Sequence, residues 1–499
     1  MSTSIPFLDK TFWITESEDN PKHVASLQLL EMPEGAPDDY IEQLVAKLRS
    51  YNKAVAPFNY RVKSIGPYPI KFAPMEELDM EYHVQVKEVE DVADKQELHK
   101  LVARLHEPRL ERNRPLWQYT VIKGKSGKQF AMYAKIHHMY GDGATMVKWF
   151  QAGYLPDPQL DEFTPVWAVE RKRRPRPKIN PVVGFFKGLW EFIIAFKDIL
   201  IILLRLLMKI LRVNPTYMPI PFSGTKTMLT GQVKRGRTVA TVDMDFARVQ
   251  SVGKRLRATV NEVLLCCFDI GVHQFLTDHG HTFEKALYTN MPINLRKPGE
   301  QTGGNKIAIV PVKLAHGKSD PILRLRQIIE NHRVVKLAAK RAHSGAFSYY
   351  TVLIQTFALL FEVLRMSSLV KPIANILISN VPGPAETRYF GDAKLLAVYP
   401  ISTIVPGGGV NITLLTYNNI ANVGIVCCDT NIKSLESMAL YFNDAFELLE
   451  KAIDDPTLTI EDIGERIVDM PRTLVDDDPY KHDDDDEHHE TRPQLEKSA

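Results

Sequence analysis

Two adjacent histidines, followed after three residues by an aspartate and a glycine, are the residues best suited to chemistry in this sequence. They lie in the stretch His137-His138-Met139-Tyr140-Gly141-Asp142-Gly143. A neutral imidazole accepts a proton at pH 7, and burial favours the neutral form. A histidine that points into the protein is therefore suited to act as a general base. The motif indicates acid–base chemistry on a substrate that gives up a proton.

The residues before this pair indicate which histidine points inward. Residues 129–138 (QFAMYAKIHH) alternate as a half-buried strand does, with apolar side chains at positions 130, 132, 134 and 136 on one face. His138 follows this face, whereas His137 shares the other face with Lys135. We therefore favour His138 as the base. Asp142 lies too near in sequence to be a relay by default, and we expect it to hold the loop by pairing with a cation.

Three other interpretations of the motif stay open. A core histidine commonly makes only structural hydrogen bonds, Gly-Asp-Gly occurs in simple turns, and His-His-x3-Asp contains side chains that bind metals. Adjacent histidines on a strand point in opposite directions, however, and no second cluster of Cys, His or carboxylate residues completes a ligand set. We expect neither a metal site nor a cofactor.

The elements around the motif mix helices and strands. Apolar spacing of three and four predicts helices over 39–51, 93–105, 246–276 with a turn near Ala258–Thr259, 351–366 and 434–453. Alternating or apolar runs predict strands over 129–138, 239–246, 286–296, 306–314, 376–384, 396–402, 409–418 and 421–429. Because no regular strand–helix–strand rhythm is present, we expect mixed sheets with helices rather than a doubly wound parallel sheet.

Residues 182–213 form the most unusual segment. All of its charged residues except Lys197 fall within an arc of about 60° on a helix, and the rest of the circumference is almost wholly apolar. No stretch reaches the roughly 20 uncharged residues that span a bilayer. The segment predicts a helix that either lies in a membrane interface or is buried between domains.

Composition excludes some classes of protein. The chain has 499 residues, 44% of them hydrophobic, with a net charge of +2, which describes a globular protein of two or three domains. Residues 476–499 hold ten acidic and three basic residues and are expected to be disordered, so the remaining body is basic. The cysteine pairs Cys266-Cys267 and Cys427-Cys428 lie in apolar runs and are expected in the core. No secretory signal is visible at the amino terminus.

The motif and several other blocks resemble a known family. HHxxxDG is the signature of the coenzyme A-dependent acyltransferase superfamily, and the order of the other blocks resembles its bacterial wax ester synthase/acyl-CoA:diacylglycerol acyltransferases. The matching blocks are Glu16-Ser17-Glu18, Pro21-Lys22-His23-Val24, Arg114-Pro115-Leu116-Trp117, His137–Gly143, Asn261-Glu262-Val263, Pro292-Ile293-Asn294-Leu295-Arg296 with Gly304-Asn305, Ser379-Asn380-Val381-Pro382-Gly383-Pro384, and Gly409-Val410-Asn411-Ile412-Thr413. Only the acidic tail lies outside the resemblance.

The resemblance implies a fold and a domain division. It implies a two-domain chloramphenicol acetyltransferase-like fold. The expected parts are an N-terminal domain over 1–165, a basic linker and apolar helix over 166–235, a C-terminal domain over 236–470, and the tail over 471–499.

The resemblance also implies roles for particular residues. His138 deprotonates an acceptor hydroxyl, which attacks the acyl-CoA thioester without an acyl-enzyme, while Asp142 keeps the geometry of the site beside His137 and Gly143. Arg296 is the expected partner of Asp142. Further candidates for oxyanion stabilisation or support are Asn261, Glu262, Ser379 and Asn380, where Glu262 replaces the aspartate of the family's Asn-Asp motif. Pro115-Leu116-Trp117 either contacts substrate or forms a packed turn.

The expected activity is transfer of a long-chain acyl group from acyl-CoA to a fatty alcohol or to diacylglycerol. The apolar helix over 351–366 is then expected either to line the acyl tunnel or to form a plain core helix. Such substrates predict a cytoplasmic enzyme that associates with the inner membrane or lipid inclusions through residues 182–213, with no nucleic-acid partner. Two rival interpretations stay open. One is a condensation-type acyltransferase that uses carrier-protein thioesters, and the other is a non-catalytic protein that coats lipid droplets on the same fold.

Overall fold

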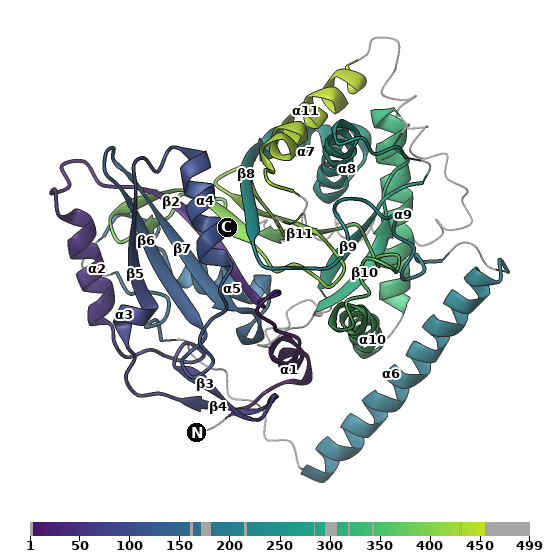
Figure 1. The fold of residues 1–499 in the computed structure, drawn as a ribbon, viewed down its shortest axis with the longest axis horizontal. Helices are drawn as coiled ribbons and strands as arrows, with labels where there is room; N and C mark the ends of the chain where they lie inside the picture. Colours follow the sequence, from purple (N-terminus) through teal and green to yellow (C-terminus); the bar gives the residue numbers. More distant parts are fainter. Residues whose placement is uncertain are drawn as a thin grey trace, which may run out of the picture.

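Two six-stranded mixed sheets form the framework of the protein (Figure 1). The computed structural model describes residues 3–159, 163–170, 181–213, 217–283, 285–294, 307–317, 320–341, 344–428, 430 and 432–454. The predicted Asp142 partner Arg296, most of the basic linker (171–180) and the acidic tail (471–499) lie outside these residues. The mixed α/β architecture agrees with the fold class expected from the sequence.

The first sheet carries the histidine pair at the end of a central strand. Its order is β12 (Tyr389–Phe390), β13 (Ala393–Ile401), β2 (His23–Glu31), β7 (Gln129–His137), β6 (Trp117–Gly124) and β5 (Val84–Val89). Only the β5–β6 pair is parallel. The other elements of this half are β1 (Thr3–Ser4), α1 (Phe7–Ile14), α2 (Tyr40–Ser50), β3 (Tyr60–Ile65), β4 (Tyr68–Pro74), α3 (Met80–His83), α4 (Lys95–His106), η1 (His138–Tyr140) and α5 (Gly143–Gly153).

Two strands of the first sheet come from far along the chain. Residues 389–401 fall within the range predicted for the C-terminal domain, yet β13 pairs with β2 along its length. The bond from the Val398 N–H to Asn422 Oδ1 ties β13 to the second sheet at 3.1 Å. Gly424 lets the two backbones approach, because a Cβ at that position would overlap Pro400 O. A single cut of the chain at 166–235 therefore does not separate the two sheets.

The second sheet has the order β10 (Ile307–Lys313), β9 (Tyr288–Asn294), β11 (Ile376–Pro382), β14 (Val410–Tyr417), β15 (Ile420–Cys428) and β8 (Arg237–Asp245). Strand β11 runs parallel to both of its neighbours, and the other pairs are antiparallel. Its helices are α7 (Phe246–Leu256), α8 (Val260–Asp278), α9 (Pro321–Arg341), α10 (Ser344–Val363) and α11 (Glu436–Ile453). Most of these elements lie where the periodicity of the sequence predicts them.

Apolar cores support the two halves, and the core beneath α4 joins them, because it includes Val239 of β8 and Val426 of β15. Strand β7 sends alternate side chains into the aromatic core beside α2 and into the core beneath α4. Both of its faces are therefore buried, including Lys135 and His137, whereas the alternation predicted a half-buried strand. In the second half, α7, α8 and α11 pack on the sheet in the largest core of the protein. All four cysteines are buried and unbridged, which confirms their predicted core positions.

Helix α6 (Pro181–Ile210) stands at the edge of the molecule beside α10 (Figure 1). A stripe through Ala195, Ile202 and Leu206 is buried against the body. The charged stripe lies next to it: Asp198 is only 15% exposed, and Lys209 Nζ donates to Met218 O at 3.2 Å. The apolar face of α6 consequently points away from the protein, so this helix is not the buried inter-domain helix that was one of the two alternatives.

Candidate active site

His138 lies at the end of β7, where the strand passes into the short helix η1. Its ring is half-buried and stacks on the ring of Phe12 from α1, with the centroids 4.2 Å apart and the planes 12° from parallel. Its backbone N–H donates to Lys22 O at 2.8 Å. As the alternation predicts, His138 follows the face of β7 that carries Met132 and Ile136.

His137 is fully buried on the opposite face. Its Nδ1 accepts a hydrogen bond from the Met139 N–H at 3.1 Å, and its Nε2 lies 3.4 Å from Glu16 Oε1. Burial alone raises the pKa of the Glu16 carboxyl, but the contact with His137, the Lys22 N–H and the charge of Arg112 lower it to about 2. Glu16 is therefore a carboxylate held beneath the histidine pair.

Asp142 begins a helix instead of forming an isolated turn. Its Oδ1 accepts from the Thr145 N–H at 3.0 Å and from Thr145 Oγ1 at 2.7 Å, which makes Asp142 the N-cap of α5. Its expected partner Arg296 lies outside the described residues. Gly143, the first residue of α5, faces the second half of the protein, because a Cβ there would lie 3.2 Å from the Val381 side chain on β11. The aspartate thus fixes the helix that follows the histidines.

Asn261 and Asn380, about 120 positions apart in sequence, meet next to this junction. Asn380 Nδ2 donates to Asn261 Oδ1, and both residues are exposed. Asn380 and half-buried Ser379 lie on β11, beside the valine that faces Gly143. The structure therefore brings three of the candidate oxyanion residues to the edge of the half that does not carry the histidines.

Glu262 is buried within the second half and supports the core helix α8. It closes a capping box with Thr259 at the start of α8, and its Oε1 lies 3.0 Å from His332 Nδ1. Burial raises the pKa of this carboxyl, but the contacts with His332 and Thr259 outweigh burial and lower it. These contacts give Glu262 a structural role, which the sequence pattern alone did not define.

Pro115, Leu116 and Trp117 form a buried packed segment behind the histidines. Leu116 O accepts from the His137 N–H at 3.0 Å, while the Leu116 N–H donates to Tyr140 Oη at 2.9 Å. The Trp117 indole donates to Phe58 O at 2.8 Å. Of the two predicted roles, these contacts support the packed turn, and they show that it positions the end of β7.

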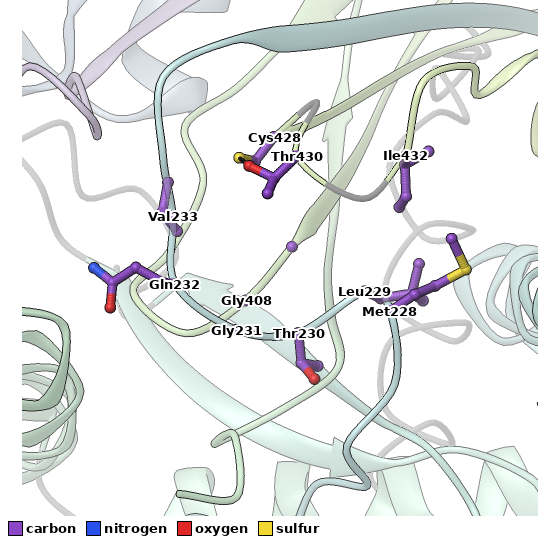
Figure 2. Close-up of a pocket in the computed structure, with 11 residues that line it drawn as sticks. Met228, Leu229, Thr230, Gly231, Gln232, Val233, Gly408, Cys428, Thr430 and Ile432 are labelled. Carbon is purple, nitrogen blue, oxygen red and sulfur yellow. Dashed lines mark hydrogen bonds between the residues drawn. The ribbon is translucent and has the colours of Figure 1, made fainter. Parts of the chain in front are cut away.

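Two cavities lie away from His138. Figure 2 shows the smaller one, about 20 Å³, between residues 228–233, the Gly408-Gly409 turn and Cys428; it has room for about one water molecule. The larger one, about 300 Å³, is lined by Tyr133 and Lys135, on the face of β7 that carries His137. Neither volume describes the site of an acyl chain beside His138. Among the described residues, no group of three His, Cys, Asp or Glu side chains is arranged to hold a metal.

Comparisons with known proteins place this site in a family. Residues 6–264, more than half of the chain, match the model of the wax ester synthase/diacylglycerol acyltransferase catalytic domain. Residues 303–450 match the model of the C-terminal domain of the same enzymes. The chain belongs to the wax ester synthase/diacylglycerol acyltransferase family. It is an acyltransferase, as the HHxxxDG motif predicted.

Relatives and solved structures agree with this assignment. The O-acyltransferase WSD of Acinetobacter baylyi is 28% identical over 450 residues, covering 89% of this chain and 96% of the relative. A probable diacylglycerol O-acyltransferase, tgs2 of Mycobacterium tuberculosis, is 28% identical over 455 residues, covering 89% and 98%. The wax ester synthase/diacylglycerol acyltransferase structure from Marinobacter aquaeolei VT8 has a TM-score of 0.68 at 24% identity, covering 90% and 99% of the two chains.

The fold is shared with a second kind of enzyme. The first condensation domain of the calcium-dependent antibiotic synthetase has a TM-score of 0.56 at 13% identity and covers 92% of this chain and 98% of its own. This likeness confirms the expected two-domain, chloramphenicol acetyltransferase-like architecture.

Sequence reasoning missed the roles of Phe12, Glu16 and Lys22, which contact the two histidines. Two of the family-like blocks contain Glu16 and Lys22, so a signal was present in the sequence. It did not indicate a contact, because more than 110 residues separate these blocks from the histidines.

Proposed function

We propose that His138 is the general base for transfer of a long-chain acyl group from acyl-CoA to a fatty alcohol or to diacylglycerol. His138 removes the hydroxyl proton as the oxygen attacks the thioester carbonyl, and the tetrahedral intermediate then expels the CoA thiolate. The protonated His138 returns the proton to this sulfur, which leaves an ester and free CoA. The placement of His138 carries this proposal: it is half-buried, fixed by Phe12 and Lys22 O, and followed five residues later by Gly143, which faces the second half.

The tetrahedral oxyanion needs hydrogen-bond donors on the side opposite the base. Asn261, Ser379 and Asn380 are the candidates, because they lie at the edge of the second half beside the residue that faces Gly143. The reaction written this way uses no metal and no redox cofactor. Membership of the family favours free acyl-CoA as the donor over a carrier-protein thioester.

The test is thiol release from palmitoyl-CoA by purified protein with hexadecanol, with dipalmitoylglycerol and without acceptor. We expect acceptor-dependent release, and a fall of about 10²- to 10⁴-fold in His138→Ala, the range that a positioned general base contributes. Lys148→Ala, an exposed change on α5, is the matched control and keeps the wild-type rate. A wild-type rate in a folded His138→Ala protein would refute the base.

We further propose that α6 docks the enzyme on a lipid surface from which the acceptor is drawn. Its outward side chains are large and apolar; Trp190 is 64% exposed and Leu204 56%. A helix facing water would place its charges outward, but α6 turns its charged stripe toward the body. An interface with acyl chains is the environment in which this orientation is favourable.

Helix α10 extends the same apolar surface. It packs beside α6, and Phe357, Leu360 and Val363 are exposed along its outer side. By length and composition, Ala346–Val363 is the one candidate membrane span among the described residues, and a third of it is buried in the protein. We propose that α10 lies at the lipid surface with α6, since its inner side packs on β10.

Charged substitutions on the outward face of α6 test the docking proposal. The triple variant Leu200→Glu, Leu204→Glu, Leu207→Glu is expected to lose sedimentation with vesicles of phosphatidylcholine and phosphatidylglycerol. It is also expected to keep thiol release with octanoyl-CoA and hexanol in solution. Lys197→Ala, on the same helix, is the control for a surface change. Unchanged vesicle binding by the triple variant would refute docking through α6.

A further inference from the structure

One short segment touches both histidines of the motif. This support segment, residues 15–22, lies between α1 and β2. Lys22 O accepts the His138 N–H at 2.8 Å, and Glu16 Oε1 lies 3.4 Å from His137 Nε2. The same Glu16 oxygen accepts the Lys22 N–H at 3.2 Å. A single carboxylate oxygen therefore contacts both the ring of His137 and the N–H of Lys22, the residue whose carbonyl holds His138.

The hydrogen bonds of His137 show which of its ring nitrogens faces Glu16 with a proton. Because His137 Nδ1 accepts from the Met139 N–H, the ring carries a proton on Nε2, the nitrogen that faces Glu16. Arg112 balances the charge of the carboxylate, with Nη2 at 3.2 Å and Nε at 3.3 Å from Glu16 Oε2. Arg112 also donates to Trp13 O and lies over the Trp13 ring, which anchors the carboxylate from α1.

A second buried carboxylate holds the other end of the support segment. Glu362, on α10, accepts from Asn20 Nδ2 through Oε1 and from the Gly407 N–H through Oε2, both at 3.1 Å. Lys22 lies near both carboxylates, and its Nζ donates to Ile404 O at 3.5 Å. Burial lowers the pKa of Lys22 to about 8, while Glu362 and Glu16 oppose that shift. The segment is thus held between the two halves of the protein.

We propose that Glu16 is a positioning residue for acyl transfer, which acts through Lys22 and His137 to set the place of His138, and that Glu362 holds the same segment from α10. The inference rests on the proposed function of His138. The physical reason is that proton transfer requires the base within hydrogen-bond distance of the substrate hydroxyl, so a displacement of about 1 Å lowers the rate by as much as 10².

Glu16→Gln is the direct test, because glutamine keeps an oxygen for the Lys22 N–H but removes the negative charge. We expect kcat with palmitoyl-CoA and hexadecanol to fall at least tenfold, while KM for palmitoyl-CoA stays within twofold. The matched control is Glu18→Gln, which changes an exposed residue of the same segment that pairs with Arg109 and Arg235. A rate for Glu16→Gln equal to that of Glu18→Gln would refute the positioning role.

A double-mutant cycle separates positioning from a general effect on the fold. If Glu16 acts through His138, Glu16→Gln lowers the residual rate of His138→Ala by less than twofold. A further tenfold fall in that background would show that Glu16 acts by another route and would overturn the proposal. A wild-type rate in His138→Ala alone would instead refute the proposed base. If Glu16→Gln does not fold, Glu362→Gln carries the same test, with a smaller fall in kcat.

Discussion

Glu16 and Glu262 are two buried carboxylates of the same kind in different surroundings. Each lies beside a buried histidine, Glu16 3.4 Å from His137 and Glu262 3.0 Å from His332. In each case contacts with neighbours lower the pKa of the carboxyl despite burial. Glu262 closes the cap of α8 in the second half, whereas Glu16 lies beneath the histidine pair of the first.

The comparison teaches that a buried carboxylate–histidine pair does not by itself mark an active site. The role of each pair follows from what lies next to the histidine. His332 comes from a helix that packs on α8, so its pair joins two core helices. His137 is followed directly by His138, so its partner acts on the geometry of the candidate base. The two carboxylates should therefore respond differently to the same substitution.

The largest expected effect is on the free energy of unfolding, when the Glu262 carboxylate is removed. Glu262→Ala removes half of the capping box and leaves His332 without its carboxylate, and the free energy of unfolding should fall by about 3–4 kcal/mol. The specific activity of the folded fraction should stay within twofold of wild type. Urea unfolding followed by thiol-release assays below the transition measures both quantities. If the specific activity of folded Glu262→Ala falls as far as that of Glu16→Gln, the two carboxylate–histidine pairs do not differ in role.

A smaller effect on the free energy of unfolding is expected when acid protonates the Glu16 carboxylate. The Glu16 pKa of about 2 lies below the ordinary value of 4.5, so this group stabilises the folded protein above pH 5, and that stability is lost as the pH falls toward 2. Between pH 5 and pH 3 the loss amounts to about 2 kcal/mol. Glu16→Gln has no carboxylate to protonate, so the difference in unfolding free energy between it and wild type should shrink by that amount.

Urea unfolding of both proteins at pH 5, 4 and 3 measures this difference. Lys148→Ala, an exposed change on α5 that alters no carboxylate, should keep a constant difference from wild type over the same range. A constant difference for Glu16→Gln as well would show that the Glu16 carboxylate is not specially stabilised in the folded protein.

The smallest expected effect comes from the other half of the capping box. Thr259→Ala removes the side-chain acceptor for the Glu262 N–H and should lower the free energy of unfolding by about 1 kcal/mol. Activity should stay within twofold of wild type, because Glu262 still contacts His332 and Asn261 keeps its contact with Asn380. Thermal unfolding with parallel activity measurements checks this, and a selective loss of kcat would show that the cap also sets the position of Asn261.

Local pattern predicted much of this protein. The alternation over 129–138 predicted β7 and the face that His138 follows. It did not predict that both faces of the strand are buried, with His137 at 0% exposure and His138 only half-buried, because the second face is covered by distant segments. Apolar spacing likewise predicted α2, α4 and the long helix α6. These features follow from periodicity, which repeats over a few residues and needs no distant partner.

Other features depended on contacts between distant segments. Pairing of β13 with β2 joins residues separated by more than 360 positions, and nothing in either strand names its partner. In the sequence, Glu16 and Glu262 both appear only as acidic residues in family-like blocks. Glu262 was predicted to belong to the site because its block matches the family's Asn-Asp motif, and Glu16 was given no role. Packing around each carboxylate decided which one supports a helix and which one lies under the histidines.

Helix α6 also combines features that follow from its local sequence with one that depends on distant contacts. Its sequence determined a wide apolar face and a narrow charged stripe, because side-chain positions around a helix follow from its 100° step. Only the tertiary structure decided which of the two faces meets the protein, since that choice depends on the surface offered by α10 and by Tyr217 and Met218. The sequence by itself determined the family motif, the elements and their faces. The partners of those faces are set by long-range packing, which no local pattern encodes.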